Sequence, residues 1–257
     1  MSSLSQDVLK WKVKPLLIIH VTALLLMLSW VFEPTRSLWL YIDDASFWFF
    51  NDALKNGGDW NRYFWALVNM QEFDKVVALL LLGIFVVHGL RSGMPLWGRH
   101  FGIMTAMFVV LGIWTGYGNH TGIGQLLPFE RLSATLEYPD SFRLAQWSIE
   151  LKTKDASADS FPGDHGMILM IVAGFVAYYF SRSYAWFAIA MAIIGTIPRV
   201  VVGAHWVTDE VVGAIFIGML ALSWNFHTPL GEYMVRIFDK LFQKALSMFG
   251  LAPGTRT

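Results

Sequence analysis

The chain has 257 residues, of which 55% are hydrophobic and only 15% are charged. A soluble domain carries roughly 25% charged residues, so this composition excludes a domain surrounded by water and favours an integral membrane protein. The absence of cysteine excludes disulfides, thiolate chemistry and cysteine-ligated metal clusters, and the absence of a basic stripe gives no reason to expect a nucleic-acid partner.

A helix needs about 20 mostly apolar residues to cross a bilayer. Six ranges satisfy this requirement: 15–32, 74–90, 101–118, 166–181, 185–203 and 208–226. The range 37–70 is rich in aromatic residues but interrupted by aspartates, which is typical of amphipathic helices at the membrane surface. We therefore predict an all-α integral membrane protein with six transmembrane helices, interfacial helices between the first and second spans, and a single domain over residues 1–257.

Basic residues predict the orientation, because short cytoplasmic loops are enriched in Lys and Arg. With the N-terminus in the cytoplasm, ten of the 19 basic residues but only three of the 19 acidic residues fall on that side. The short loops that carry Arg91 with Arg99, and Arg182, weigh most in this count. Both termini are then cytoplasmic, and the polar ends of the later spans face the extracytoplasmic side.

Two polar stretches, 160–165 and 199–209, lie beside these apolar spans, where ionisable groups are usually functional. His205 and Asp209 are four residues apart, so on a helix they would share one face. A carboxylate behind an imidazole fixes its tautomer and leaves the other ring nitrogen as a nucleophile. Arg199, six residues earlier, offers a planar fork that matches phosphate oxygens.

The stretch 160–165 supplies complementary groups. Pro162 and Gly163 predict a turn before the fourth span, so that the amides and the positive dipole end of that helix favour an anion. His165, at the helix start, could protonate a departing phosphate oxygen. These residues together indicate phosphoryl transfer. The alternative is a metal site, which the nearby positive charge of Arg199 makes less favourable. Its ligands would be oxygen and nitrogen atoms of Asp155, Asp159, Asp164, His165, His205 and Asp209.

The spacing of Arg199, His205 and Asp209 resembles that of the type 2 phosphatidic acid phosphatase superfamily, in which Ser-Arg is followed after five residues by His and after three more by Asp. Here Pro198 replaces the Ser. The stretch 162–165, Pro-Gly-Asp-His, resembles the Pro-Ser-Gly-His motif of the same superfamily. The resemblance covers about residues 119–215 and the six-helix plan.

Within that superfamily, the stretches 153–167 and 198–209 are similar to those of the lipid A 1-diphosphate synthases of Gram-negative inner membranes. The resemblance implies transfer of the distal phosphate of undecaprenyl diphosphate to the 1-phosphate of lipid A, through a phosphohistidine on His205 and without a cofactor. The active site would face the periplasm. The lipid partners would then be undecaprenyl diphosphate, lipid A and the surrounding bilayer.

The same resemblance implies catalytic roles for His205, Asp209 and His165. The expected phosphate-binding residues are Arg199, Arg131, Gly163, Asp164 and Lys154. In the first motif of the superfamily, a Lys is followed after six residues by Arg-Pro. Arg131 stands for this Arg, but Leu132 follows it, and no Lys occupies the upstream position, so Lys154 is the candidate for the missing amine.

Two other functions remain open from the sequence. A lipid phosphatase would use the same first step with water as acceptor, on undecaprenyl diphosphate or phosphatidylglycerol phosphate. A transporter or membrane scaffold would use the charged cluster as a pathway, but no polar residues continue this cluster through the spans.

Overall fold

The structure is a computed structural model that describes residues 9–118 and 131–251, and within these ranges it contains helices and no strands. The long helices are α2 (Val13–Val31), α3 (Glu33–Asn56), α4 (Gly58–Val68), α5 (Gln71–Ser92), α6 (Trp97–Gly118), α10 (Asp164–Tyr179), α11 (Arg182–Val201), α12 (Ile215–His227) and α13 (Leu230–Met248). Short elements are η1 (Met94–Leu96), α8 (Ala134–Glu137), α9 (Leu144–Trp147), η2 (Ile149–Leu151) and the π-helix η3 (Asp209–Ala214).

Five helical segments in the described ranges are long and apolar enough to cross a membrane. They are α2, α5, the segment Met94–Gly116, α11 and the segment Asp209–His227, in which η3 leads into α12. These match five of the six expected spans. The remaining expected span, 166–181, corresponds to α10, which has 16 residues. A helix of that length is about 24 Å long, shorter than the ~30 Å hydrocarbon core, so the sixth span stays a prediction.

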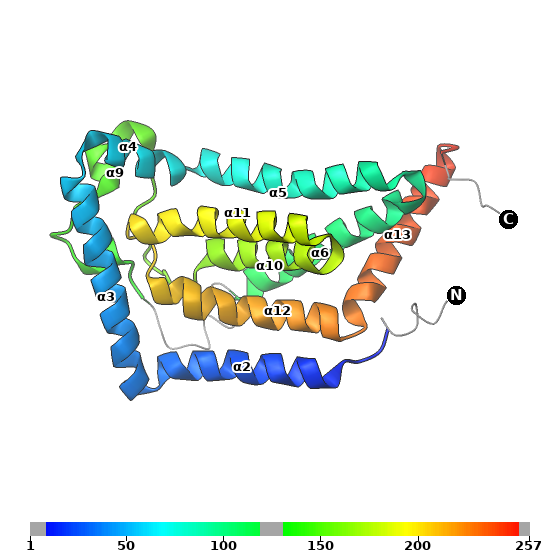
Figure 1. Cartoon of the computed structure of the whole chain (residues 1–257), viewed down its shortest axis with the longest axis horizontal. Coiled ribbons are helices and arrows are strands. Elements are labelled where there is room, and N and C mark those ends of the chain that lie inside the picture. Colours follow the sequence, from blue (N-terminus) through cyan, green and yellow to red (C-terminus); the bar gives the residue numbers. More distant parts are fainter. Residues whose placement is uncertain (1–8, 119–130, 252–257) are drawn as a thin grey trace.

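The range 37–70 forms most of α3 and α4. In Figure 1, α3 runs across one end of the bundle, from the end of α2 to α4. Its side chains divide between two environments: Asp43 and Phe47 are buried against the protein, whereas Tyr41 and Phe49 are each 70% exposed. Exposed aromatic rings at a bundle end suit a membrane interface, where we still expect these two helices to lie.

The core is built around α10, whose buried residues include Met167, Ile171 and Phe175. This helix packs against α11 and α12. Close contact depends on small residues, because a Cβ on Gly174 would lie 2.4 Å from a Leu222 methyl group and one on Gly218 would lie 2.6 Å from the Met170 sulfur. Small residues serve the same purpose between membrane helices generally. The core therefore fixes the start of α10, where two of the predicted site residues, Asp164 and His165, lie.

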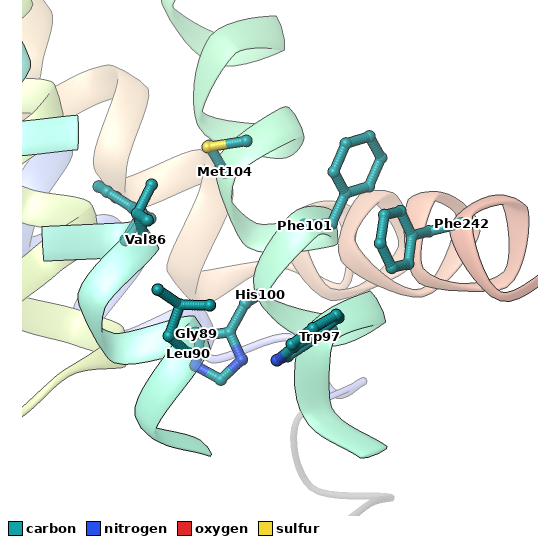
Figure 2. Close-up of a pocket in the computed structure, with 9 residues that line it drawn as sticks. Val86, Gly89, Leu90, Trp97, His100, Phe101, Met104 and Phe242 are labelled. Atoms are coloured by element: carbon teal, nitrogen blue, oxygen red, sulfur yellow. The ribbon is translucent and has the colours of Figure 1, made fainter. Parts of the chain in front are cut away.

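At the other end of the bundle, α2 begins and α13 ends (Figure 1). An apolar pocket of about 210 Å³ lies there between α5, α6 and α13. Figure 2 shows Trp97, Phe101 and Phe242 around it, and the rings of Phe101 and Phe242 stack with centroids 4.7 Å apart. His100, also in its wall, bonds to His88 at 2.7 Å. His88 is thus a packing histidine, as histidines within apolar spans usually are.

The contact between α6 and α13 provides a test of the packing. A Cβ on Gly102 would lie 2.3 Å from the carbonyl oxygen of Val235, whereas a Cβ on Gly112 meets no described atom within 4 Å. Gly102→Ala should force α13 away from α6 and cost about 1–3 kcal/mol. Its thermal unfolding midpoint in detergent should fall below those of the wild type and of the control Gly112→Ala. Equal midpoints for the two variants would contradict this account.

Candidate active site

The polar residues gather at the end of the bundle that α3 and α4 cover. A turn after α11 brings the chain back toward the start of α10. Gly203 has φ +79°, a left-handed conformation that glycine adopts without strain. The backbone amides of Ala204 and His205 donate to the carbonyl oxygen of Arg199 at 3.0 and 3.1 Å. The turn thus ends α11 and fixes the backbone of His205 next to the end of that helix.

His205 is 5% exposed, and both of its ring nitrogens have defined surroundings. Its Nδ1 lies 2.9 Å from the carbonyl oxygen of Ser160 and 3.5 Å from Asp209 Oδ2. Only a protonated Nδ1 can donate to a carbonyl oxygen, so Nε2 carries the lone pair of the neutral ring. Nε2 lies 3.6 Å from Asp164 Oδ1. This is the tautomer that a nucleophilic histidine requires.

Asp209 lies behind His205, but the two residues do not share a regular helix as expected. His205 is part of the turn, and Asp209 begins η3. The backbone amide of Trp206 donates to Asp209 Oδ2 at 2.7 Å. The Asp209 carboxylate therefore holds both the imidazole and the backbone of the turn. In a regular helix the backbone would not need this side-chain acceptor.

Acidic neighbours raise the pKa of His205. Burial disfavours the charged ring, but a hydrogen bond with Asp209 and the negative charges of Glu210, Asp209 and Asp164 more than offset it. The imidazole consequently keeps its second proton to a higher pH than a free histidine does.

His165 stands opposite His205, with ring centroids 6.5 Å apart. Its Nδ1 lies 2.8 Å from Asp164 Oδ1, and its Nε2 lies 3.1 Å from Arg199 Nη2. The amide of Gly163, which we expected to face an anion, instead donates to the carbonyl oxygen of Asp209 at 2.9 Å. This bond fastens the start of α10 to η3.

Arg199 is 3% exposed and its guanidinium is held by the protein. Nη1 donates to the backbone carbonyl of Asn69 at 2.6 Å and to its side-chain oxygen. Nη2 donates to the carboxylate of Asp74. Neither partner was among the residues predicted from the sequence. One feature of the sequence could have indicated Asp74: it is an acidic residue at the border of an apolar span.

Arg131 is likewise enclosed. It donates to Asp43 at 2.7 Å, to the Thr208 hydroxyl at 2.6 Å and to Asp209 at 3.3 Å. Its guanidinium carbon lies 4.8 Å from the ring centre of Trp30 and 4.5 Å from that of Trp206, within the range of cation–π attraction. Arg131 therefore supports Asp209 from behind.

Asp43, the carboxylate partner of Arg131, was not among the predicted site residues. We had counted it with the aspartates that interrupt an interfacial segment, yet it is 1% exposed. It accepts hydrogen bonds from the amide and the hydroxyl of Thr208, at 2.9 and 2.5 Å. Asp43 thus links α3 to the segment that carries Asp209.

A polar cavity of about 280 Å³ opens beside His205. Its lining residues are Lys154, Ser157, Ala158, Asp159, Pro162, Asp164 and His205. Three expected site residues thus face one space: the nucleophile candidate, the amine candidate and Asp164. Arg131 and Arg199 are not part of this wall, and they influence the cavity through Asp209 and His165.

The larger metal site considered from the sequence does not assemble among the described residues. The carboxylate of Asp155 pairs with Arg143 at 2.6 Å, and that of Asp209 pairs with Arg131. Asp164, His165 and His205 do bring ligand atoms within 4.8 Å of one another. Arg199 lies 3.1 Å from one of these atoms and repels a cation, so the donor set suits an anion better.

Known proteins with similar sequences identify the family of this chain. The pattern of the PAP2 superfamily matches residues 121–231. The chain is 33% identical over 228 residues to the lipid A 1-diphosphate synthase of Escherichia coli (strain K12), covering 88% of this chain and 92% of that protein. No solved structure gave a significant match. The resemblance seen in the motifs is confirmed: the chain belongs to the PAP2 superfamily, whose chemistry makes it a phosphate-transferring or phosphate-hydrolysing enzyme.

Proposed function

We propose that the protein transfers the distal phosphate of undecaprenyl diphosphate to the 1-phosphate of lipid A, at the periplasmic face of a Gram-negative inner membrane. The observation that carries the proposal is His205, whose Nδ1 is tied to Ser160 and Asp209 and whose side chain lines a polar cavity. The name of the Escherichia coli relative supports the choice of acceptor.

The reaction proceeds in two displacements. In the first, His205 Nε2 bonds to the distal phosphorus, and the bond from that phosphorus to the bridging oxygen breaks, releasing undecaprenyl phosphate. We assign to His165 the role of giving a proton to the departing oxygen. In the second, an oxygen of the lipid A 1-phosphate bonds to the same phosphorus as the N–P bond breaks. The energy comes from the donor phosphoanhydride, so the scheme needs no cofactor.

The basic residues have separate roles in this scheme. Lys154, on the cavity wall, neutralises the phosphate that enters. Arg199 acts through His165, because its Nη2 lies 3.1 Å from the Nε2 of that ring. Arg131 acts through Asp209, which orients His205 and stabilises the imidazolium formed on phosphorylation. The glycine at 163 keeps the start of α10 close to η3, and Asp164 holds His165.

Replacement of the nucleophile tests the first displacement. His205→Ala should lower phosphate release from labelled undecaprenyl diphosphate by at least about a thousandfold, because no other group on the cavity wall forms the covalent intermediate. His20→Ala is the matched control, since His20 bonds within α2 and lies outside the site. The assay uses purified protein in detergent. Comparable turnover by the two variants would exclude His205 as nucleophile.

The acceptor is tested separately with the wild-type protein. Labelled donor is incubated with and without lipid A, and the products are separated by chromatography. Label on lipid A is the expected result. Free phosphate at the same rate in both mixtures would identify water as the acceptor and the protein as a lipid phosphatase.

The support behind Asp209 gives another expected outcome. Asp43→Asn leaves Arg131 without its closest carboxylate, which should cost about 1.5–3 kcal/mol of stability and reduce turnover at the same time. Asp44→Asn is the matched control, because that carboxylate bonds only to the Tyr138 hydroxyl, at 2.7 Å, among the described contacts. Thermal unfolding and the labelled-donor assay measure both effects. Equal losses in the two variants would contradict a supporting role for Asp43.

A further inference from the structure

Asn69, the residue that follows α4, connects two parts of the candidate site. It is 1% exposed, and both polar atoms of its side chain have partners. The amide nitrogen donates to the Thr153 hydroxyl at 2.9 Å and to the backbone carbonyl of Lys154 at 2.8 Å. The amide oxygen accepts from Arg199, whose guanidinium also donates to the Asn69 backbone carbonyl at 2.6 Å. Asn69 therefore joins the end of α4 to two other segments of the chain.

The partners of the amide determine both its orientation and the residue type. A guanidinium only donates hydrogen bonds and a backbone carbonyl only accepts them, so the oxygen must face Arg199 and the nitrogen must face Lys154. A carboxylate at position 69 would have no donor for the Lys154 carbonyl, and an apolar side chain would satisfy neither partner. The asparagine amide serves both partners at once.

These two partners act at different places in the site. Lys154 lines the polar cavity, whereas Nη2 of Arg199 lies 3.1 Å from Nε2 of His165. Lys152, two residues before Lys154, has φ +46°, in the left-handed region that residues other than glycine rarely adopt. A backbone in this conformation persists where its surroundings hold it in place. The bonds from Asn69 hold the chain immediately after this point.

A second anchor follows Lys154 directly. The carboxylate of Asp155 accepts hydrogen bonds from the Arg143 guanidinium at 2.6 Å and from the backbone amide of Ala145 at 2.9 Å. These partners lie at the start of α9, so they shape the chain around Lys154 without connecting it to α11. The side chain of Asn69 provides that connection.

We propose that Asn69 is a positioning residue that holds Lys154 on the cavity wall at a fixed place relative to Arg199. This inference rests on the proposed function, in which Lys154 neutralises the entering phosphate and Arg199 acts through His165. The fixed separation of the two cations lets one diphosphate engage the Lys154 amine while His165 reaches the departing oxygen. Asn69 itself touches no substrate and acts through these residues.

Kinetics of one substitution separate the two contacts. Asn69→Asp still accepts from Arg199 but cannot donate to the Lys154 carbonyl. The KM for undecaprenyl diphosphate should rise about tenfold, the effect of one lost charge-assisted hydrogen bond, while kcat stays near its wild-type value. Asn69→Ala also removes the acceptor for Arg199 and should lower kcat as well.

Asn51→Asp is the matched control for this substitution. The Asn51 amide is buried and donates to the backbone carbonyl of Phe142 at 2.8 Å, so the variant loses a comparable bond away from Lys154. It should lose stability but keep the wild-type KM. Equal KM values for Asn51→Asp and Asn69→Asp overturn the proposal.

A double-mutant cycle tests the route through Lys154. Lys154→Ala should raise the KM about tenfold, and adding Asn69→Asp should raise it little further, because the side chain that Asn69 positions is gone. Effects that multiply to about a hundredfold indicate independent action and overturn the proposal. Thr153→Val removes one bond of the Asn69 amide and leaves Arg199 unchanged, so it should raise the KM by less. An unchanged KM in this variant overturns the proposal even if Asn69→Asp does not fold.

Binding of inorganic diphosphate gives a readout that does not depend on transfer. Its affinity, measured by titration calorimetry in detergent, should fall in Asn69→Asp and in Lys154→Ala, and by little more in the double variant. This coupling in a protein that neither cleaves undecaprenyl diphosphate nor phosphorylates lipid A would reject the proposed function alone. Equal affinity in the wild type and in folded Asn69→Asp would reject the inference alone.

Discussion

The burial of the Asp209 carboxylate is the constraint on which the rest of the site depends. This side chain has no exposed surface, so its charge must be compensated within the protein. Arg131 provides the cation, the amide of Trp206 provides a donor, and His205 takes the remaining side. The carbonyl oxygen of the same residue holds the amide of Gly163. Asp209 thereby joins the turn after α11, the start of α10 and the segment that carries Arg131.

Compensation of buried charge also explains why distant elements meet at one end of the bundle. Asp43 brings α3 to Arg131, and Asn69 and Asp74 bring the α4–α5 junction to Arg199. Each arginine pairs with a carboxylate in a region of low dielectric, where an unpaired charge would be costly. The geometry of His165 and His205 is thus imposed by residues that never reach the cavity.

The sequence predicted the helical class, six spans of which five correspond to helices long enough to cross a membrane, and the proximity of His165 and His205. These features follow from hydropathy and from a short motif, both of which are local. It did not predict Asp43, Asn69 or Asp74, because their roles depend on contacts across 88 to 130 residues. The expected contact of His205 with Asp209 is present at 3.5 Å, but the two residues do not lie on one regular helix, because the turn that begins at Gly203 extends through His205.

The separation of these partners along the chain has a consequence for biosynthesis. Asp74 precedes Arg199 by 125 residues, so at a synthesis rate of about 5–20 residues per second it waits on the order of ten seconds for its partner. During that interval an ionised carboxylate remains stable only in contact with water. The segments that carry Asp43 and Asp74 must therefore stay at the aqueous boundary while the later helices insert. The candidate site can therefore close off from water only after the segment that carries Arg199 has been made.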